Sequence, residues 1–289
     1  MFPNLANDPA FNVASLTKAI NILPNKYGRL NQLNLMPVKG VATRTISVEE
    51  YNGVLTLLPT KPVGAPGTTG KAGKRKVRSF VVPHIPHEDI VLASDVDGVR
   101  EFGSQDQMKT VITEVNNKLQ AMRNKHDITL EHLRMGALKG IILDADGSTL
   151  YNLYTEFEIT QKSVDFVLGT AGTEIREKCA EVVRHIEDNL LGEVMTSVRC
   201  LVSKEFFDKL VKHATVKDAY KYFNQTQNLS GDFRKGFTFG GITFEEYRGS
   251  ASDGTTTRRF IADGEGHAFP EGTTETFETV CAPADFNET

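Results

Sequence analysis

The 289-residue sequence has no tryptophan, only three cysteines and no continuous apolar run of the length that spans a membrane. Cys179, Cys200 and Cys281 are widely spaced without a CxxC pair, so neither a disulfide framework nor a zinc site is predicted. We expect them to be small, mostly buried apolar residues. The N-terminal MFPNLANDPAFNVASLTKAINILPNKYG lacks the charged start, apolar core and cleavage site of a secretory signal. These absences predict a globular protein that is made and kept in a cytoplasm.

The motifs of phosphate and metal sites are also missing. A Walker loop needs Gly five residues before its GK pair and Ser or Thr after it, but Ala65 and Ala72 stand there. Asp144, Asp146 and Gly147 resemble the opening of a calcium loop without its closing Glu, which favours a turn. Pro83 and Pro86 disfavour a helical metal site among His84, His87, Glu88 and Asp89. We therefore expect no metal and no cofactor.

One stretch would suit acid–base catalysis if the chain were an enzyme. The segment DGEGHAFPEG carries Asp263, Glu265, His267 and Glu271. No nucleophile motif such as GxSxG lies nearby, and charged residues in a Gly- and Pro-containing loop are more often solvated. We expect no catalytic residue, and a hydrolase that uses this loop remains an alternative hypothesis.

The net charge of −4 is divided unevenly along the chain. Residues 1–80 carry 11 Lys and Arg against three carboxylates, a net charge of +8, so the remaining residues carry −12. Opposite charges of this size favour head-to-tail contact between the basic segment of one copy and the acidic body of another. The basic run at 71–78 could also contact nucleic acid phosphates, although no aromatic residues are interleaved to stack on bases.

Proline and glycine punctuate the first 40 residues, which predicts an extended arm with one short helix near Val13 to Ile22. From Val41 to Leu58 the pattern predicts two strands around a turn at Asn52-Gly53. After the flexible basic insertion KPVGAPGTTGKAGKRKVR, Ser79 to Val82 is predicted as a returning strand. Together these segments predict a long two-stranded finger with a basic tip.

A helical period then begins at Ser104 and continues to Leu138. Apolar residues and one histidine recur every three or four positions: Met108, Val111, Ile112, Val115, Leu119, Met122, His126, Leu130 and Leu133. Ser104 with Gln107 is a capping box, and Gly136 and Gly140 supply a stop. About 32 residues at about 1.5 Å each span about 48 Å. We expect this helix to be the spine of a domain.

The rest of the sequence mixes short helices and strands without a βαβ repeat, which predicts the α+β class. IILDADGSTLYNLY is predicted as a hairpin, and a helix begins at a Thr173 cap and ends at Gly192. A buried strand is expected at Val194–Val202, helices at Ser203–His213 and Thr215–Phe223, and strands at Phe237–Tyr247 and Arg258–Ile261.

Taken in order, these features resemble a tailed-phage major capsid protein of the lambda-like capsid protein E family. The stretches that carry the resemblance cover most of the chain: GRLNQLNLMPVKGVATRTISVEEYNGVLTLLPT, SFVVPHIPHEDIVLASDVDGVREFGS, MRNKHDITLEHLRMGALKGIILDADGST, FRKGFTFGGITFEEYRG and HAFPEGTTETFETVCAPADFNET. Members of that family continue past APADF for some tens of residues, so either this sequence is truncated at Thr289 or it lacks their tail.

The resemblance implies a Hong Kong 97-type capsid fold. It would comprise an N-terminal arm (1–40), an extended loop (41–90), a peripheral domain (91–159) with the spine helix 104–138, an axial domain (160–262) and a return to the peripheral domain (263–289). Hexamers and pentamers would close an icosahedral shell around packaged DNA, which is bound without sequence specificity. The implied partners are other copies, a scaffolding protein, a portal and a decoration protein, with assembly in the host cytoplasm and a final place in the virion.

Position at the tip of the finger, charge and resemblance together predict that the basic loop grips the next subunit. The residues expected in that contact are Lys61, Lys71, Lys74, Arg75, Lys76 and Arg78. Another self-assembling compartment or a tail-tube protein needs similarly extended contacts and remains the alternative.

Overall fold

A computed structural model describes residues 28–52, 74–92, 111–217, 219, 234 and 236–283. The chain divides into two compact units, Met1–Met36 with Pro86–Phe277 and Pro37–Ile85 with Glu278–Thr289. Helices and strands are mixed in sequence order, which confirms the α+β class. The helix predicted near Val13 to Ile22 lies outside the described residues, as do Lys61 and Lys71.

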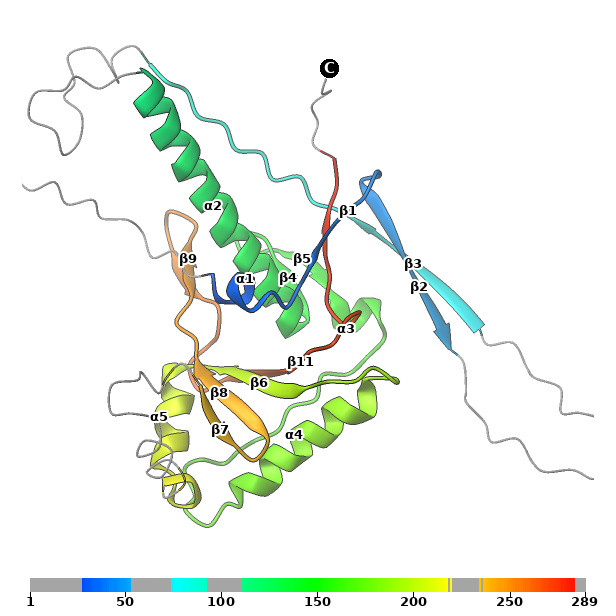
Figure 1. Cartoon of the computed structure of the whole chain (residues 1–289), viewed down its shortest axis with the longest axis vertical. Helices are drawn as coiled ribbons and strands as arrows, with labels where there is room; N and C mark the ends of the chain where they lie inside the picture. The colour runs from blue at the N-terminus through cyan, green and yellow to red at the C-terminus, as the bar shows by residue number, and fades with distance from the viewer. Residues whose placement is uncertain are drawn as a thin grey trace, which may run out of the picture. The chain divides into compact units, whose positions relative to one another are not determined.

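The first unit is built on a four-stranded sheet in the order β11-β6-β8-β7 (Figure 1). Its strands are β6 (Ser197–Val202), β7 (Phe237–Phe239), β8 (Ile242–Glu246) and β11 (Gly266–Glu271). β6 and β8 run parallel, whereas β7 and β11 are antiparallel to their neighbours. The strands predicted at 194–202 and 237–247 are thereby confirmed with shorter bounds.

Two helices, α4 (Ile175–Asn189) and α5 (Lys204–Lys212), contribute to the core on one face of this sheet. Alternate strand residues point into that core, since side chains of a strand alternate between its faces. The buried members are Phe166, Ile175, Cys179, Val198, Cys200, Val202, Phe207, Leu210, Val216, Phe237, Phe239, Ile242 and Phe244. Ser203 caps α5, with its Oγ accepting from the Phe206 amide at 3.4 Å. The predicted Thr173 cap of α4 is wrong, because Glu174 holds that position and the Thr173 hydroxyl donates to the Val167 carbonyl.

The opposite face of the sheet packs with α1 (Arg29–Leu33) and α2 (Val111–Lys139) around a second core. Its buried members are Leu30, Met135, Leu201, Tyr247, Phe260, Ile261 and Phe269. α2 confirms the predicted spine helix over its described part, while the expected start at Ser104 lies outside the described residues. Gly140 ends α2 with a φ of +83°, and a Cβ there would collide with the ring of Tyr154.

The predicted apolar stripe of the spine helix is wrong in part. Val115, Leu119 and His126 are exposed, whereas the buried positions of its second half include Glu131, Arg134 and Met135. The apolar spacing misplaced the buried side of the helix. That side carries the charged residues Glu131 and Arg134, whose partners lie elsewhere in the fold.

Smaller hairpins complete the first unit. β4 (Ile141–Leu143) pairs with β5 (Thr149–Asn152), which confirms the hairpin predicted around Asp146-Gly147, and α3 (Leu153–Glu156) follows. β9 (Ser250–Ser252) pairs with β10 (Thr257–Arg259). The Arg258 guanidinium donates to the carbonyls of Ala145 and Asp146, which fastens one hairpin turn to the other hairpin.

DGEGHAFPEG is not the solvated loop that was predicted. Its Gly266–Glu271 segment is β11, which pairs antiparallel with β6 over six residue pairs. Pro270 is compatible with this pairing because β11 is the last strand of the sheet order, and an edge strand tolerates a missing amide donor.

The second unit holds two separate two-stranded sheets. β1 (Val38–Gly40) pairs parallel with β12 (Thr279–Cys281), and β2 (Thr45–Asn52) pairs antiparallel with β3 (Lys74–Val81). A two-stranded finger is therefore confirmed, and β2 pairs with the basic segment itself, while the strand predicted after Asn52-Gly53 lies outside the described residues. Cys281 is exposed on β12, which corrects the expectation of a buried residue, whereas Cys179 and Cys200 are buried and form no disulfide.

Candidate functional site

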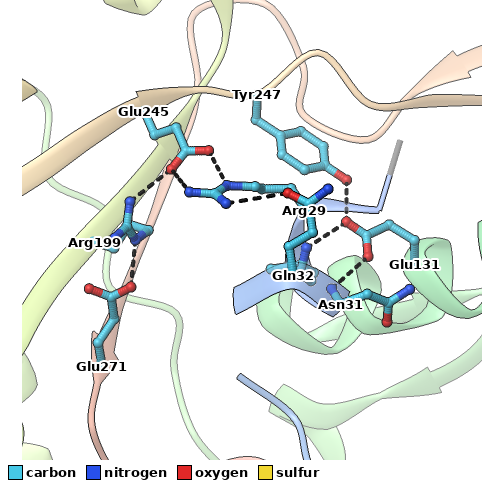
Figure 2. Close-up of polar contacts among 9 residues, drawn as sticks. Arg29, Asn31, Gln32, Glu131, Arg199, Glu245, Tyr247 and Glu271 are labelled. Carbon is cyan, nitrogen blue, oxygen red and sulfur yellow. Dashed lines mark hydrogen bonds and ion pairs between the residues drawn. The ribbon is translucent and has the colours of Figure 1, made fainter. Parts of the chain in front are cut away.

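A buried carboxylate on the spine helix α2 holds helix α1 of the first unit. Glu131 is completely buried, and its carboxylate accepts from the Leu30 amide at 2.8 Å and the Asn31 amide at 3.3 Å (Figure 2). The Tyr247 hydroxyl donates to the same carboxylate at 3.2 Å. α1 has no side-chain cap of its own, so Glu131 supplies acceptors for amides that a first helical turn leaves unpaired.

Burial sets the electrostatics of this carboxylate. Desolvation raises the pKa of Glu131, while the amides of Leu30 and Asn31, the Tyr247 hydroxyl and the Arg134 charge all act in the opposite direction. Arg134 also donates to the Asn31 side chain and to the Met36 carbonyl, the latter at 3.3 Å. The spine helix thus holds both ends of the segment from 30 to 36.

A chain of charges continues from α1 across the sheet. Arg29 forms a fork with Glu245 of β8, with contacts of 2.5 and 2.9 Å. Arg199 of β6 contacts Glu245 at 2.7 Å and Glu271 of β11 at 2.5 Å, as Figure 2 shows. Strand alternation places these three sheet residues on the face that packs with α1. Because each carboxylate already accepts charged donors, the arrangement is suited to fixing α1 and not to acid–base chemistry.

The best catalytic candidates are not assembled into a site. Glu271 is paired with Arg199, and Asp263 is paired with Arg259. Burial, with a smaller effect of the Lys139 charge, lowers the pKa of His267, whose Nε2 lies 3.7 Å from Glu265, beyond hydrogen-bond distance. Among the described residues, no group of three or more His, Cys, Asp or Glu is placed to hold a metal.

The finger brings together the basic residues that the sequence predicts at an intersubunit contact, as far as they are described. Lys74, Arg75, Lys76 and Arg78 all belong to β3. Lys76 is exposed and Arg78 is half-buried, and alternation places both on one face of the hairpin. Val77 and Val81 occupy the other face and are 56% and 58% exposed.

Lack of burial distinguishes the whole second unit. None of its residues whose burial the structure describes is buried. An isolated two-stranded hairpin is marginally stable at best in water, because ordering its backbone is not offset by a buried core. This finger and its exposed valines therefore have the character of an interaction element.

The chain combines a packed unit with an exposed finger, and comparison of its sequence with known families identifies the family to which it belongs. The family described as phage major capsid protein E matches residues 12–289. The chain belongs to the phage major capsid protein E family. Its function is that of a major capsid protein, a structural component of the phage virion.

Relatives within this major capsid protein family cover nearly all of the chain. The major capsid protein of Pseudomonas phage KPP10 is 33% identical over 300 residues, which cover 98% of this chain and 85% of that protein. The major capsid protein of Salmonella phage Felix O1 is 29% identical, with 90% and 78% covered. A solved capsid structure of the cyanophage P-SCSP1u matches at 13% identity and a TM-score of 0.43, covering 82% of this chain and 71% of that chain. No described helix is both long and apolar enough to cross a membrane.

Proposed function

We propose that this major capsid protein assembles into hexamers and pentamers that close an icosahedral shell around phage DNA. The observation that carries the proposal is the finger β2–β3, which has no buried residue among those described and is basic along β3. An element that is at best marginally stable alone gains order when another copy covers it. A shell supplies such a neighbour to every copy.

We further propose that the elements are arranged as in a Hong Kong 97-type capsid fold. The arm comprises 1–40, the extended loop 41–90, the peripheral domain 91–159 and the axial domain 160–262, and 263–289 return to the peripheral domain. The 29-residue helix α2 supports the spine, and the separate unit that contains β2–β3 supports the extended loop. β11 pairs with β6, so in this arrangement the returning segment first completes the axial sheet.

Charge determines what the finger contacts in this proposal. Lys61, Lys71, Lys74, Arg75, Lys76 and Arg78 meet the acidic body of an adjacent subunit, since residues beyond 80 carry −12. Packaged DNA lies inside the shell, and a scaffolding protein, a portal and a decoration protein take part in assembly in the host cytoplasm.

Electron microscopy of the purified chain, alone and with its scaffolding protein, tests the proposal. We expect capsomers and closed shells, and we expect deletion of Gly64–Lys76 to leave a folded subunit that does not close shells. Rings of one symmetry stacked into tubes would favour the tail-tube alternative. Persistent monomers, or normal shells and unchanged salt resistance after the deletion, would contradict the proposed roles of the chain and of the loop respectively.

A further inference from the structure

The turn between α4 and β6 holds an apolar residue in an unfavourable backbone conformation. The Glu193 amide donates to the Leu190 carbonyl at 3.1 Å and encloses Leu191 and Gly192, whose φ angles are +51° and +99°. Positive φ at both central positions favours Asn and Gly, because a side-chain Cβ crowds the following carbonyl in this region. A leucine at the first of these positions is therefore strained.

Packing within its own subunit does not offset the backbone strain at Leu191. Its side chain is 95% exposed, and that of Val194, directly after the turn, is 79% exposed. Large apolar side chains stabilise a protein by leaving water, which neither of these does in the single chain. The turn thus presents an apolar knob, Leu191 with Val194, to the outside.

The knob is held in place and is not a loose loop. The Glu193 carboxylate accepts from the amides of Thr274 and Glu275 at 2.7 and 2.6 Å and from the hydroxyls of Thr274 and Thr276. The Thr276 hydroxyl and these other donors lower the pKa of Glu193 to about 2. Because Glu193, the only charged group of the turn, already has its partners, burying the turn would not leave this carboxylate unpaired.

A hollow that could receive such a knob lies beside it on the same subunit. Its volume is about 400 Å³, and its lining mixes apolar residues with polar and charged ones, namely Val183, Leu190, Met195 and Val198 with Glu187, Glu193, Thr196 and Ser197. Val194 lies at this hollow as well. Every copy therefore carries an apolar projection beside a depression whose lining is partly apolar.

We propose that the Leu191 knob of one copy inserts into this hollow of a neighbouring copy. The two surfaces differ, so the contact is head-to-tail, and such a contact forms a closed ring when its rotation closes. The occupant is a second copy because the chain belongs to a major capsid protein family, and the shell proposed above brings many copies of it into contact. This contact rests on the proposed assembly and names one place where two subunits meet.

Substitution of Leu191 separates a role between subunits from a role within one. Leu191→Asn suits the left-handed turn, so the subunit should melt at the same or a higher temperature, while association between subunits weakens about ten- to a hundredfold. Val167→Asn is the matched control, since Val167 is also left-handed (φ +45°) but only 42% exposed and lies outside the knob. Sedimentation velocity of the purified full chain measures association. A less stable Leu191→Asn subunit, or one that assembles like the unsubstituted chain, would overturn the proposal.

Cross-linking then tests the geometry directly. In a Cys281→Ser background, one preparation carries Leu191→Cys and another Val183→Cys, and the two are mixed, assembled and oxidised. We expect mixed disulfide-linked dimers, because a disulfide needs the two Cα atoms within about 7 Å. Normal shells without mixed dimers would refute this contact but leave the proposed function standing. If the unsubstituted chain formed no oligomer, the proposed function would fall, and this contact with it.

Discussion

In the first unit, a four-stranded sheet is packed on both faces by helices, whereas the finger of the second unit exposes valines and has no buried residue among those described. Charged groups follow the same division. Glu131, Glu245 and Arg199 are buried or half-buried and held by partners inside the first unit, while Lys76 is exposed on the finger. The difference teaches that one part of the chain is stabilised by its own core and the other depends on what it meets.

Removing Glu131 should have the largest effect on the packed unit. Glu131→Ala leaves the amides of Leu30 and Asn31 and the Tyr247 hydroxyl without their acceptor, and we expect unfolding to become easier by about 3–5 kcal/mol. Glu131→Gln should cost only about 1–2 kcal/mol, because it keeps an acceptor and burial already disfavours the charge. Urea denaturation measures both, with the exposed Glu177→Ala as control. Equal losses of unfolding free energy for Glu131→Ala and Glu177→Ala would show that the Glu131 contacts do not stabilise the packed unit.

Breaking the charge chain at Arg199 should have the next largest effect. Arg199→Met leaves Glu245 and Glu271 without the guanidinium between them, for a loss of about 2–4 kcal/mol in unfolding free energy. Arg199→Lys keeps the charge but cannot contact both carboxylates through separate nitrogens of one planar group, so it should recover only part of the loss. Thermal unfolding of the two variants decides this. Full recovery by lysine would show that charge alone matters.

Acid should loosen the turn that Glu193 fastens. Its pKa is lowered to about 2, so the carboxylate's contribution to stability is complete above its ordinary pKa and is lost as pH falls through about 2. Glu193→Gln should therefore show a smaller loss of stability between pH 5 and pH 2 than the unsubstituted chain. Acid titration followed by circular dichroism measures the difference. Identical acid profiles would mean that the Thr274–Thr276 contacts do not hold in solution.

The finger should respond in the opposite way to the packed unit. Lys76→Glu with Arg78→Glu should change the unfolding free energy of the subunit by no more than about 1 kcal/mol, since ion pairs near the surface seldom contribute more. The same pair should impair assembly, because it reverses the charge that faces an acidic neighbour. Light scattering follows assembly and urea denaturation follows folding. A destabilised subunit that still assembles normally would contradict this prediction, because the finger would then stabilise its own subunit and not the contact between subunits.

Local patterns in the sequence predicted the spine helix, the hairpin at Asp146-Gly147 and the helices at 175–189 and 204–212, because their periods and turn residues lie within short segments. They did not predict β11, whose partner strand lies about 70 residues earlier and whose Gly and Pro favour a loop. Glu131 was missed for the same reason. Its partners lie about 100 residues away, and a charged residue at helical spacing between Ile128 and Met135 was its only local signal.

Hydrogen exchange of free subunits and assembled shells tests the central claim most directly. Amides of β6, in the middle of the packed sheet, should be protected in both states, because opening them requires much of the first unit to unfold. Amides of β2 and β3 should exchange rapidly in free subunits and slow by more than about tenfold in shells, where a neighbouring copy covers the finger. If the finger exchanged equally fast in both states, or were already as protected as β6 in the free subunit, the account would be contradicted.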